Sequence, residues 1–374
     1  MAAKKKMKAS SINPTIFPDD ITIELFSRLP VKSLMRFKCL STFFNSLPSE
    51  SYFMDNHQLS CRRSRLDEIK FFVPECDGFH SIEMRKEGRK VSRCDFDFPY
   101  NNLSYKSGLF CFSVEKFESV RIFNPSTREV IVLPRVKQLY NLRNLSECYL
   151  SLYYGCSYTL GYEPEENKYK VLMTLCVSRE CTRNWVFTLG TDKSWREINR
   201  VIYSPHKKKH TLCVCGVIYI LNCWSTSLVA FDLKAENFKF IPLWRCSQLW
   251  NGNYELIEVN GKLAVWNGTS KLVHLRVLVD PQKEEWQSHI IHCPSNMKNF
   301  GTYRICSCCD GEILIFLIRL NESVKSRSCY CYDVRKNTWK YLKTSLFGVK
   351  NCVDKGIYTY VERLVPLKKN CNVS

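Results

Sequence analysis

A unit that begins with glycine and recurs between residues 108 and 333 constrains the fold of this chain most strongly. In each copy the glycine precedes an apolar run, which leads to an Asp or Asn turn and then to another strand. The turn residue follows the glycine by 16 to 22 residues, and the four pairs are Gly108 and Asn124, Gly216 and Asp232, Gly261 and Asp280, and Gly311 and Asp333. Repeats of about 40–50 residues made of several short strands are typical of propeller blades.

Further strands are expected around these four units. Two hairpins, over residues 158–172 and 186–198, occupy the gap between the first and second units. Residues 61–100 fit the repeat less clearly, and segments 71–73 and 81–84 are predicted to be its first strands. Aromatic residues that start the strand after each turn are predicted to fill the space between blades, namely Phe238, Trp286 and Trp339.

The first sixty residues follow a helical pattern instead. Acidic residues 19–20 precede apolar residues at helical spacing, and Pro30 ends this first segment. A second helix is predicted over residues 31–40 and a third over 42–47, with Ser41 as its cap and Pro48 as its end. Three helices this short need tertiary partners to be stable.

Apolar residues lie on more than one side of each predicted helix. They are Phe17, Ile21, Leu25, Leu29, Val31, Leu34, Phe37, Phe43 and Phe44. A bundle of about forty residues cannot bury all of them within itself. The surplus predicts a surface for a partner.

Composition excludes several classes of protein. The longest apolar run, residues 313–318, is far shorter than the ~20 residues of a membrane-spanning helix, so no membrane protein is expected. Residues 1–8 are basic, but no apolar segment follows them, so secretion is not expected either. The formal net charge of +19 favours acidic partners. The basic run at 206–210 is either a solvated loop or a nuclear-localisation or nucleic-acid patch, although no aromatic residue interleaves it.

The 21 cysteines are odd in number and are expected to be reduced, buried thiols. Cys306 and Cys309 have the two-residue spacing of a zinc site but lack a second pair, so we expect no metal there. The pairs 213/215 and 329/331 are spaced to face one side of a strand, as core residues do. Cys39 is predicted to be a packed core thiol rather than a nucleophile.

Motifs of catalysis are missing from the sequence. It contains no Gly-rich phosphate loop, no His-Glu-x-x-His and no Gly-x-Ser-x-Gly elbow. These absences are weak evidence by themselves; the expectation of no catalytic residue and no cofactor comes from the resemblance of residues 17–41 to a known family.

Residues 17–41, which include Leu29-Pro30-Val31-Lys32-Ser33-Leu34, resemble an F-box of the plant form. The resemblance extends to about residue 56, roughly a tenth of the chain. It implies binding to the Skp adaptor of cullin-based ubiquitin ligases, through an interface formed or supported by Pro18, Ile21, Leu25, Leu29, Pro30, Val31, Leu34, Phe37, Leu40 and Phe44.

One segment departs from the family pattern. Phe44 stands where a Trp is usual, and the basic residue before it is lost. Phe keeps the apolar contact but lacks the indole donor. We therefore expect this chain to bind the adaptor more weakly than is typical of the family. The alternative left open is a three-helix cap packed on its own downstream domain.

The repeats resemble the F-box-associated domain found behind plant F-boxes, over about residues 100–345. The matching segments are 122–129, 160–164 with 169–172, 188–191 with 194–196, and 231–233 with Phe238. That family is kelch-like, which implies a propeller that presents substrates to the ligase.

These observations predict an α+β protein with segregated domains. A basic disordered tail (1–13) precedes an F-box three-helix bundle (14–60), an all-β, propeller-like domain (61–365) and a flexible tail (366–374). The predicted function is substrate recognition in a Skp-cullin-F-box ligase in the cytoplasm, the nucleus or both. The alternative is a basic propeller that binds acidic protein or nucleic acid without ligase assembly, although nucleic acid is the less expected partner. Candidate target-binding loops are 139–150, 205–210 and 246–254.

Overall fold

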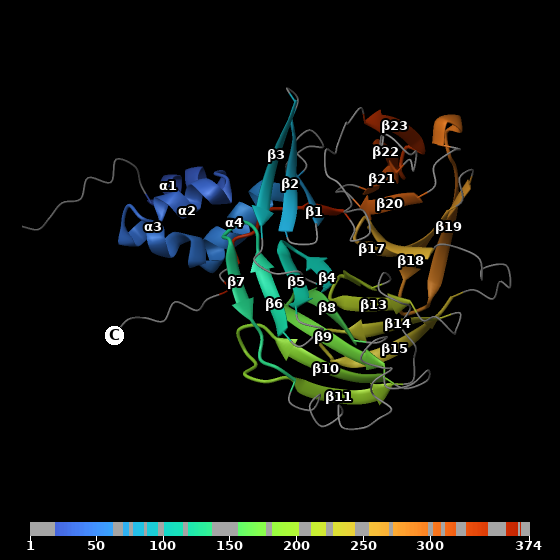
Figure 1. Cartoon of the computed structure of the whole chain (residues 1–374), viewed down its shortest axis with the longest axis horizontal. Helices are drawn as coiled ribbons and strands as arrows, with labels where there is room; N and C mark the ends of the chain where they lie inside the picture. The colour runs from blue at the N-terminus through green and yellow to red at the C-terminus, as the bar shows by residue number, and fades with distance from the viewer. Residues whose placement is uncertain are drawn as a thin grey trace, which may run out of the picture.

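The computed structural model describes residues 19–62, 70–74, 78–85, 88–95, 101–114, 119–136, 156–176, 182–201, 211–221, 227–243, 254–268, 272–297, 302–307, 311–318, 327–342, 357–365 and 367. Helices from the N-terminal part lie beside a ring of sheets (Figure 1). The expected fold class, short F-box helices followed by an all-β propeller, is confirmed.

Four α-helices form the N-terminal domain: α1 (Asp19–Ser27), α2 (Val31–Phe37), α3 (Thr42–Ser46) and α4 (Ser51–Arg62). Pro30 separates α1 from α2, and the Ser41 hydroxyl accepts the Phe44 amide at 3.3 Å to cap α3, as predicted. Helix α4 was not predicted. Helix α3 ends at Ser46, and Pro48 lies in the first turn of a 3-10 helix, η1 (Leu47–Ser49), where proline is tolerated, so the helical region continues beyond it.

Six four-stranded antiparallel sheets make up the described propeller. Blade 1 is β24 (Tyr358–Tyr360), β1 (Lys70–Pro74), β2 (Gly78–Arg85) and β3 (Gly88–Asp95); blade 2 is β4 (Asn101–Lys106), β5 (Leu109–Val114), β6 (Ser119–Asn124) and β7 (Glu129–Val132); blade 3 is β8 (Cys156–Glu163), β9 (Lys168–Cys176), β10 (Thr182–Thr188) and β11 (Arg196–Val201). Blade 4 is β12 (Thr211–Val214), β13 (Val217–Leu221), β14 (Ser227–Asp232) and β15 (Asn237–Pro242); blade 5 is β16 (Tyr254–Val259), β17 (Lys262–Gly268), β18 (Leu272–Asp280) and β19 (Glu285–His292); blade 6 is β20 (Thr302–Ser307), β21 (Glu312–Ile318), β22 (Arg327–Asp333) and β23 (Thr338–Leu342).

The ring closes through strands from the two ends of the domain. In blade 1, β24 pairs antiparallel with β1, with Phe71 opposite Thr359. The predicted first strands, 71–73 and 81–84, are β1 and part of β2. The two hairpins that fill the gap in the repeat, 158–172 and 186–198, form the single blade 3.

Buried apolar clusters lie between neighbouring blades all around the ring. Six such clusters join blades 1 and 2, 2 and 3, 3 and 4, 4 and 5, 5 and 6, and 6 and 1. Phe238, Trp286 and Trp339 pack against the clusters between blades 3 and 4, 4 and 5, and 5 and 6, which confirms their predicted role. Burial of apolar side chains between facing sheets is therefore the main interaction that holds neighbouring blades together.

The glycines of the repeat follow the first strand of each blade in tight turns. Gly108 and Gly216 have φ of 86° and 78°, and the residues before them, Ser107 and Cys215, also have positive φ. Two successive residues with positive φ are the geometry of a two-residue type I′ hairpin, which favours glycine.

The acidic and amide turn residues of the repeat close the hairpin between the third and fourth strands. One side-chain oxygen of Asp232 accepts the amides of Lys234 and Ala235, both at 2.8 Å. Asp280 and Asp333 accept the amides two and three residues later in the same way, and Asn124 accepts that of Ser126. The repeat found in the sequence therefore reflects one kind of turn, in which an Asp or Asn side chain accepts backbone amides.

The cysteine predictions are confirmed in part. Cys213, Cys329 and Cys331 are buried, but Cys215 is exposed because it lies in the tight turn after β12 rather than in the strand. Cys39 is also exposed, so its prediction as a core thiol is wrong; it follows the end of α2. Cys309 lies outside the described residues, among which no metal-binding group of three side chains occurs.

No helix among the described residues is long and apolar enough to span a membrane.

Replacing Asp280 with alanine tests the turn chemistry. The variant leaves the amides of Gln282 and Lys283 without their acceptor, so we expect the free energy of unfolding to fall by about 1–2 kcal/mol. Glu285→Ala removes a carboxylate from an exposed strand position and should change it by less than about 0.5 kcal/mol. Urea unfolding monitored by tryptophan fluorescence compares the two, and equal midpoints would contradict the assigned role of Asp280.

Candidate protein-binding site

The helical domain has a small core of its own. Val31, Leu34, Leu47 and Phe53 are buried together, and they come from α2, η1 and α4. The fifth buried member is Leu364, which follows β24 at the other end of the chain. The helices therefore do not complete their core from their own residues.

Several large apolar side chains of this domain are exposed. Ile21 and Leu25 on α1 are 46% and 50% exposed, and four residues apart they lie on one face of the helix. Leu40 and Phe43, around the start of α3, are 66% and 37% exposed. Exposed apolar groups gathered on so small a domain are typical of a protein-binding surface.

The ten residues predicted for this surface differ in the exposure of their side chains. Ile21, Leu25, Pro30 and Leu40 are exposed; Leu29, Phe37 and Phe44 are half-buried; Val31 and Leu34 are buried; Pro18 lies outside the described residues. The buried pair shapes the helices from within, while the exposed group is available to a partner.

Phe44 belongs to an aromatic cluster that joins three helices. Its ring stacks on Phe26 of α1 with centroids 4.7 Å apart, and it lies 5.3 Å from Phe43 and 6.1 Å from Phe37 of α2. The apolar contact expected of Phe44 is therefore made, in large part, within the domain. It holds α3 against α1 and leaves Phe43 exposed.

His57 fixes the corner between α1 and α2. The buried ring on α4 donates from Nε2 to the carbonyl oxygen of Leu29 at 3.0 Å, just before Pro30. Burial lowers the pKa of His57, opposed by its hydrogen bond to Leu29 and by the charge of Glu362. The folded domain therefore favours the neutral imidazole.

This pKa predicts that the helical domain loses stability in weak acid. Because the folded pKa lies below the ordinary value of 6.5, the stabilisation is present above pH 6.5 and is lost as pH falls through the folded pKa. We expect the loss to reach up to about 1.4 kcal/mol per pH unit. His57→Gln, which cannot titrate, should flatten the dependence. Urea unfolding at a series of pH values, monitored by circular dichroism, measures both slopes, and parallel slopes would refute this role of His57.

Glu362 supplies a polar contact at the start of α2. One carboxylate oxygen accepts the backbone amide of Val31 at 2.8 Å, and the other is ion-paired with Lys70 of β1. Lys70 also pairs with Glu83 of β2 at 3.1 Å. Sequence reasoning missed Glu362, because nothing near it in the chain distinguishes it from a surface carboxylate.

The helices attach to the propeller face that carries the tight turns. Arg363, just after β24, lies against the turn at Gly108 and accepts, through its carbonyl oxygen, an amide hydrogen from Asn124 at 3.2 Å. In antiparallel blades the alternate connections depart from the opposite ends of the strands. Strands β7 and β11 end at that opposite face. The candidate target-binding segments 139–150 and 205–210, which come after these strands in the sequence, lie outside the described residues. So does 246–253, while Tyr254 begins β16.

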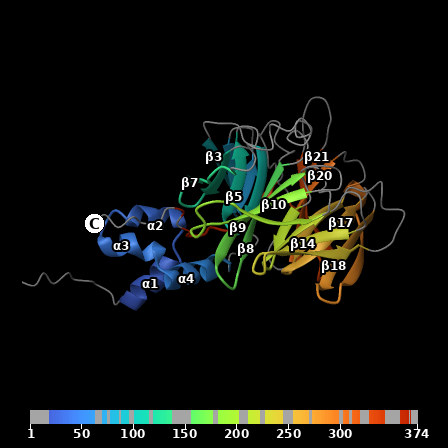
Figure 2. The ribbon, with the colours of Figure 1, turned by 90° about the horizontal axis from the view of Figure 1, so that it is seen from below.

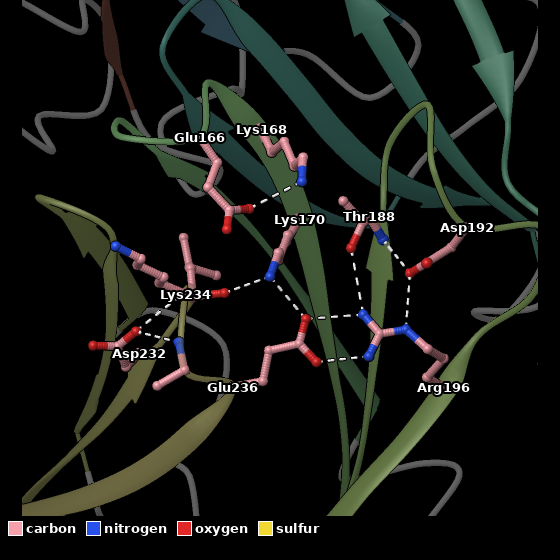
Figure 3. Close-up of polar contacts among 11 residues, drawn as sticks. Glu166, Lys168, Lys170, Thr188, Asp192, Arg196, Asp232, Lys234 and Glu236 are labelled. Atoms are coloured by element: carbon pink, nitrogen blue, oxygen red, sulfur yellow. Dashed lines mark hydrogen bonds and ion pairs between the residues drawn. The ribbon is translucent and has the colours of Figure 1, made fainter.

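A polar network ties blades 3 and 4 together on the tight-turn side (Figure 3). The side chain of Lys170 is 6% exposed; its ammonium group donates to the Leu233 carbonyl at 2.5 Å and pairs with Glu236 at 2.7 Å. Arg196 pairs with the same carboxylate at 2.6 Å, and the Arg196 contact, followed by Lys170, lowers the pKa of Glu236 to about 2. Glu236 therefore stays ionised and neutralises two cations from the neighbouring blade.

Glu236→Gln tests this network. The substitution leaves buried Lys170 without its counter-ion, so we expect the free energy of unfolding to fall by about 2 kcal/mol or more. Glu166→Gln removes the partner of Lys168 in an exposed pair and should cost about 0–1 kcal/mol. Urea unfolding at neutral pH compares the two; a cost for Glu236→Gln no larger than for Glu166→Gln would contradict the network.

Comparisons with known proteins give two family matches. Residues 66–363 match the F-box associated beta propeller domain, and residues 15–55 match the F-box domain. The F-box protein DOR of Arabidopsis thaliana is 31% identical over 301 residues, which cover 73% of each chain. The F-box protein At1g30790 of the same plant is 28% identical over 378 residues, covering 89% of this chain and 90% of its own. Among solved structures, one from the nidogen/laminin complex has a TM-score of 0.45 at 7% identity, covering 79% of this chain and 99% of its own.

Proposed function

The chain belongs to the F-box proteins that carry an F-box-associated β-propeller domain, and from this premise we propose that it is a substrate-recognition subunit of a Skp-cullin-F-box ubiquitin ligase. In this role the helical domain binds a Skp-family adaptor, and through it a cullin. The propeller binds the target protein. The place of action is the cytosol, the nucleus or both.

The exposed apolar side chains of the helical domain are the observation that carries the proposal. Ile21, Leu25 and Leu40 remain about half or more exposed, and none of them belongs to the small core of the domain. Covering them with a partner would bury apolar area that the folded chain leaves in water. Pro30, also exposed, lies between α1 and α2 beside the carbonyl that His57 holds in place.

The adaptor surface proposed here differs from the usual one at Phe44. The ring is held by Phe26 and Phe37, so a partner meets Phe43 more fully than Phe44. Without an indole donor at this position, the affinity rests on apolar contact. We therefore expect adaptor binding that is weaker than is typical of the family.

The propeller contributes recognition rather than chemistry. A ligase subunit of this kind raises the effective concentration of a target lysine near a ubiquitin that another subunit carries, which is a proximity effect. We place the target on the face opposite the helices, where the longer connections of the blades depart. A bound target then lies away from the surface that the adaptor occupies.

A double substitution on the exposed face tests adaptor binding. Leu25→Ala with Leu40→Ala removes apolar surface that contributes little to the fold, and each side chain is half or more exposed. Losing the burial of both in the complex should weaken adaptor affinity by roughly 30-fold. Binding of the full chain to a purified Skp-family adaptor is measured by titration calorimetry. Leu29 and Pro30 are less informative targets because Leu29 is partly packed in the core.

The matched control is Ile290→Ala with Phe240→Ala. These side chains are 59% and 42% exposed on the outer strands β19 and β15, which lie on the side of the ring away from the helices (Figure 1). The control should bind the adaptor as the unmodified chain does. If the unmodified chain does not bind, the ligase role fails, and a basic propeller that acts without ligase assembly takes its place. If the two double variants bind the adaptor equally well, the adaptor does not bind the face that carries Leu25 and Leu40.

A further inference from the structure

Residues 361–367, here called the strap, cross from the closing strand β24 to the helical domain and back to the propeller. In Figure 2 the red C-terminal segment lies between the helices and the blades. The described part of the strap is residues 361–365 and Leu367. Its side chains contact the two domains in turn, and Glu362 contacts both.

Two strap residues complete the helical domain. Leu364 is 3% exposed and packs with Val31 and Leu34 of α2 in the small core. Glu362 accepts the Val31 amide, and this contact replaces a missing cap: the residue before α2 is Pro30, and no side chain at that position accepts a helix amide. A carboxylate at a helix N-terminus also interacts favourably with the helix dipole.

The residues between them hold the propeller. The Arg363 guanidinium carbon lies 4.3 Å above the ring centre of Tyr162, and its nitrogens donate to the hydroxyls of Tyr169 at 2.8 Å and Tyr162 at 3.0 Å. Asn124 donates to the carbonyl oxygens of Arg363 and Val365, at 3.2 and 3.0 Å. These contacts reach blades 2 and 3, although the strap leaves from blade 1.

The last described residue adds a further contact on the propeller side. Leu367 donates its backbone amide to Glu129 at 3.1 Å, and its side chain packs on the cluster between blades 2 and 3. The strap is therefore fixed to the helical domain at Glu362 and Leu364 and to the propeller on either side of Leu364. Because contacts to the two domains follow one another along the strap, the strap resists both translation and rotation of one domain relative to the other.

We propose that the strap is a positioning element for adaptor binding: it completes the helical core and fixes the docking face at one orientation relative to the propeller. The inference rests on the proposed adaptor function. A fixed orientation matters because a ligase subunit works by holding its target within reach of a reactive group, and a loose joint would dilute the effective concentration. Because the strap also completes the core beneath the docking face, adaptor binding should depend on a residue more than 300 positions from the F-box in sequence.

Leu364→Ala in the full chain tests the proposal with two readouts. Hydrogen exchange of the α2 amides should speed up by roughly 30-fold or more, because a buried Leu→Ala substitution costs that much in the local equilibrium. Adaptor affinity should fall, while exchange in β9 and β10 stays slow. Leu364→Val, a smaller truncation, should give an intermediate effect and serves if the alanine variant does not fold.

Leu243→Ala is the matched control, since it makes the same change at a buried propeller position between blades 4 and 5, outside the strap. It should leave α2 exchange and adaptor affinity unchanged. Unchanged α2 exchange in both Leu364 variants overturns the proposal even if the adaptor binds. Faster α2 exchange with unaltered adaptor affinity overturns the positioning role. Because exchange needs no adaptor, failure of the ligase function itself would appear separately, as absence of binding by the unmodified chain.

Discussion

Pairing of β24 with β1 is the constraint on which the rest of this structure depends. It joins Tyr358–Tyr360 to Lys70–Pro74 and so closes six sheets into a ring in which every blade face is covered by a neighbour. Without it, the two clusters that contain Phe71 and Phe72 would lose the apolar side chains that residues 357–360 contribute to them. The same pairing places residues 361–367 at the tight-turn face, where the helices are attached.

The helical domain is consequently not an independent module joined by a linker. Its core takes Leu364 from the opposite end of the chain, and its second helix is capped by Glu362 rather than by a neighbour in sequence. A domain of this size buries too little apolar area to be stable by itself while also leaving Leu25 and Leu40 exposed. Support from the propeller offsets that exposure, so this face of the helices can stay apolar.

The tight-turn face of the propeller carries polar contacts between blades. Tight turns on one face hold charged contacts between blades, such as the pairing of Glu236 with Lys170 and Arg196, and these fix the blades against one another. Lys106 and Glu258, from the inner strands of blades 2 and 5, pair at 3.0 Å and tie opposite sides of the ring. A rigid scaffold of this kind leaves the other face free to vary in its connections, which is where recognition usually evolves.

Much of the fold follows from local patterns that the sequence shows directly. Pro30 and Ser41 bound the helices, the turn residues such as Gly216 and Asp280 mark the blades, and Trp339 fills a space between them, because caps, turns and strand faces depend on residues only a few positions apart. The surplus of apolar side chains on the helices, which leaves Ile21, Leu25 and Leu40 exposed, was also predictable from helical spacing. The number of blades, the fourth helix, the exposure of Cys39 and Cys215 and the role of Glu362 and Leu364 were not. They depend on contacts between distant segments, the Glu362 bond to Val31 spanning 331 positions, so only the closed ring, which brings the two ends together, decided them.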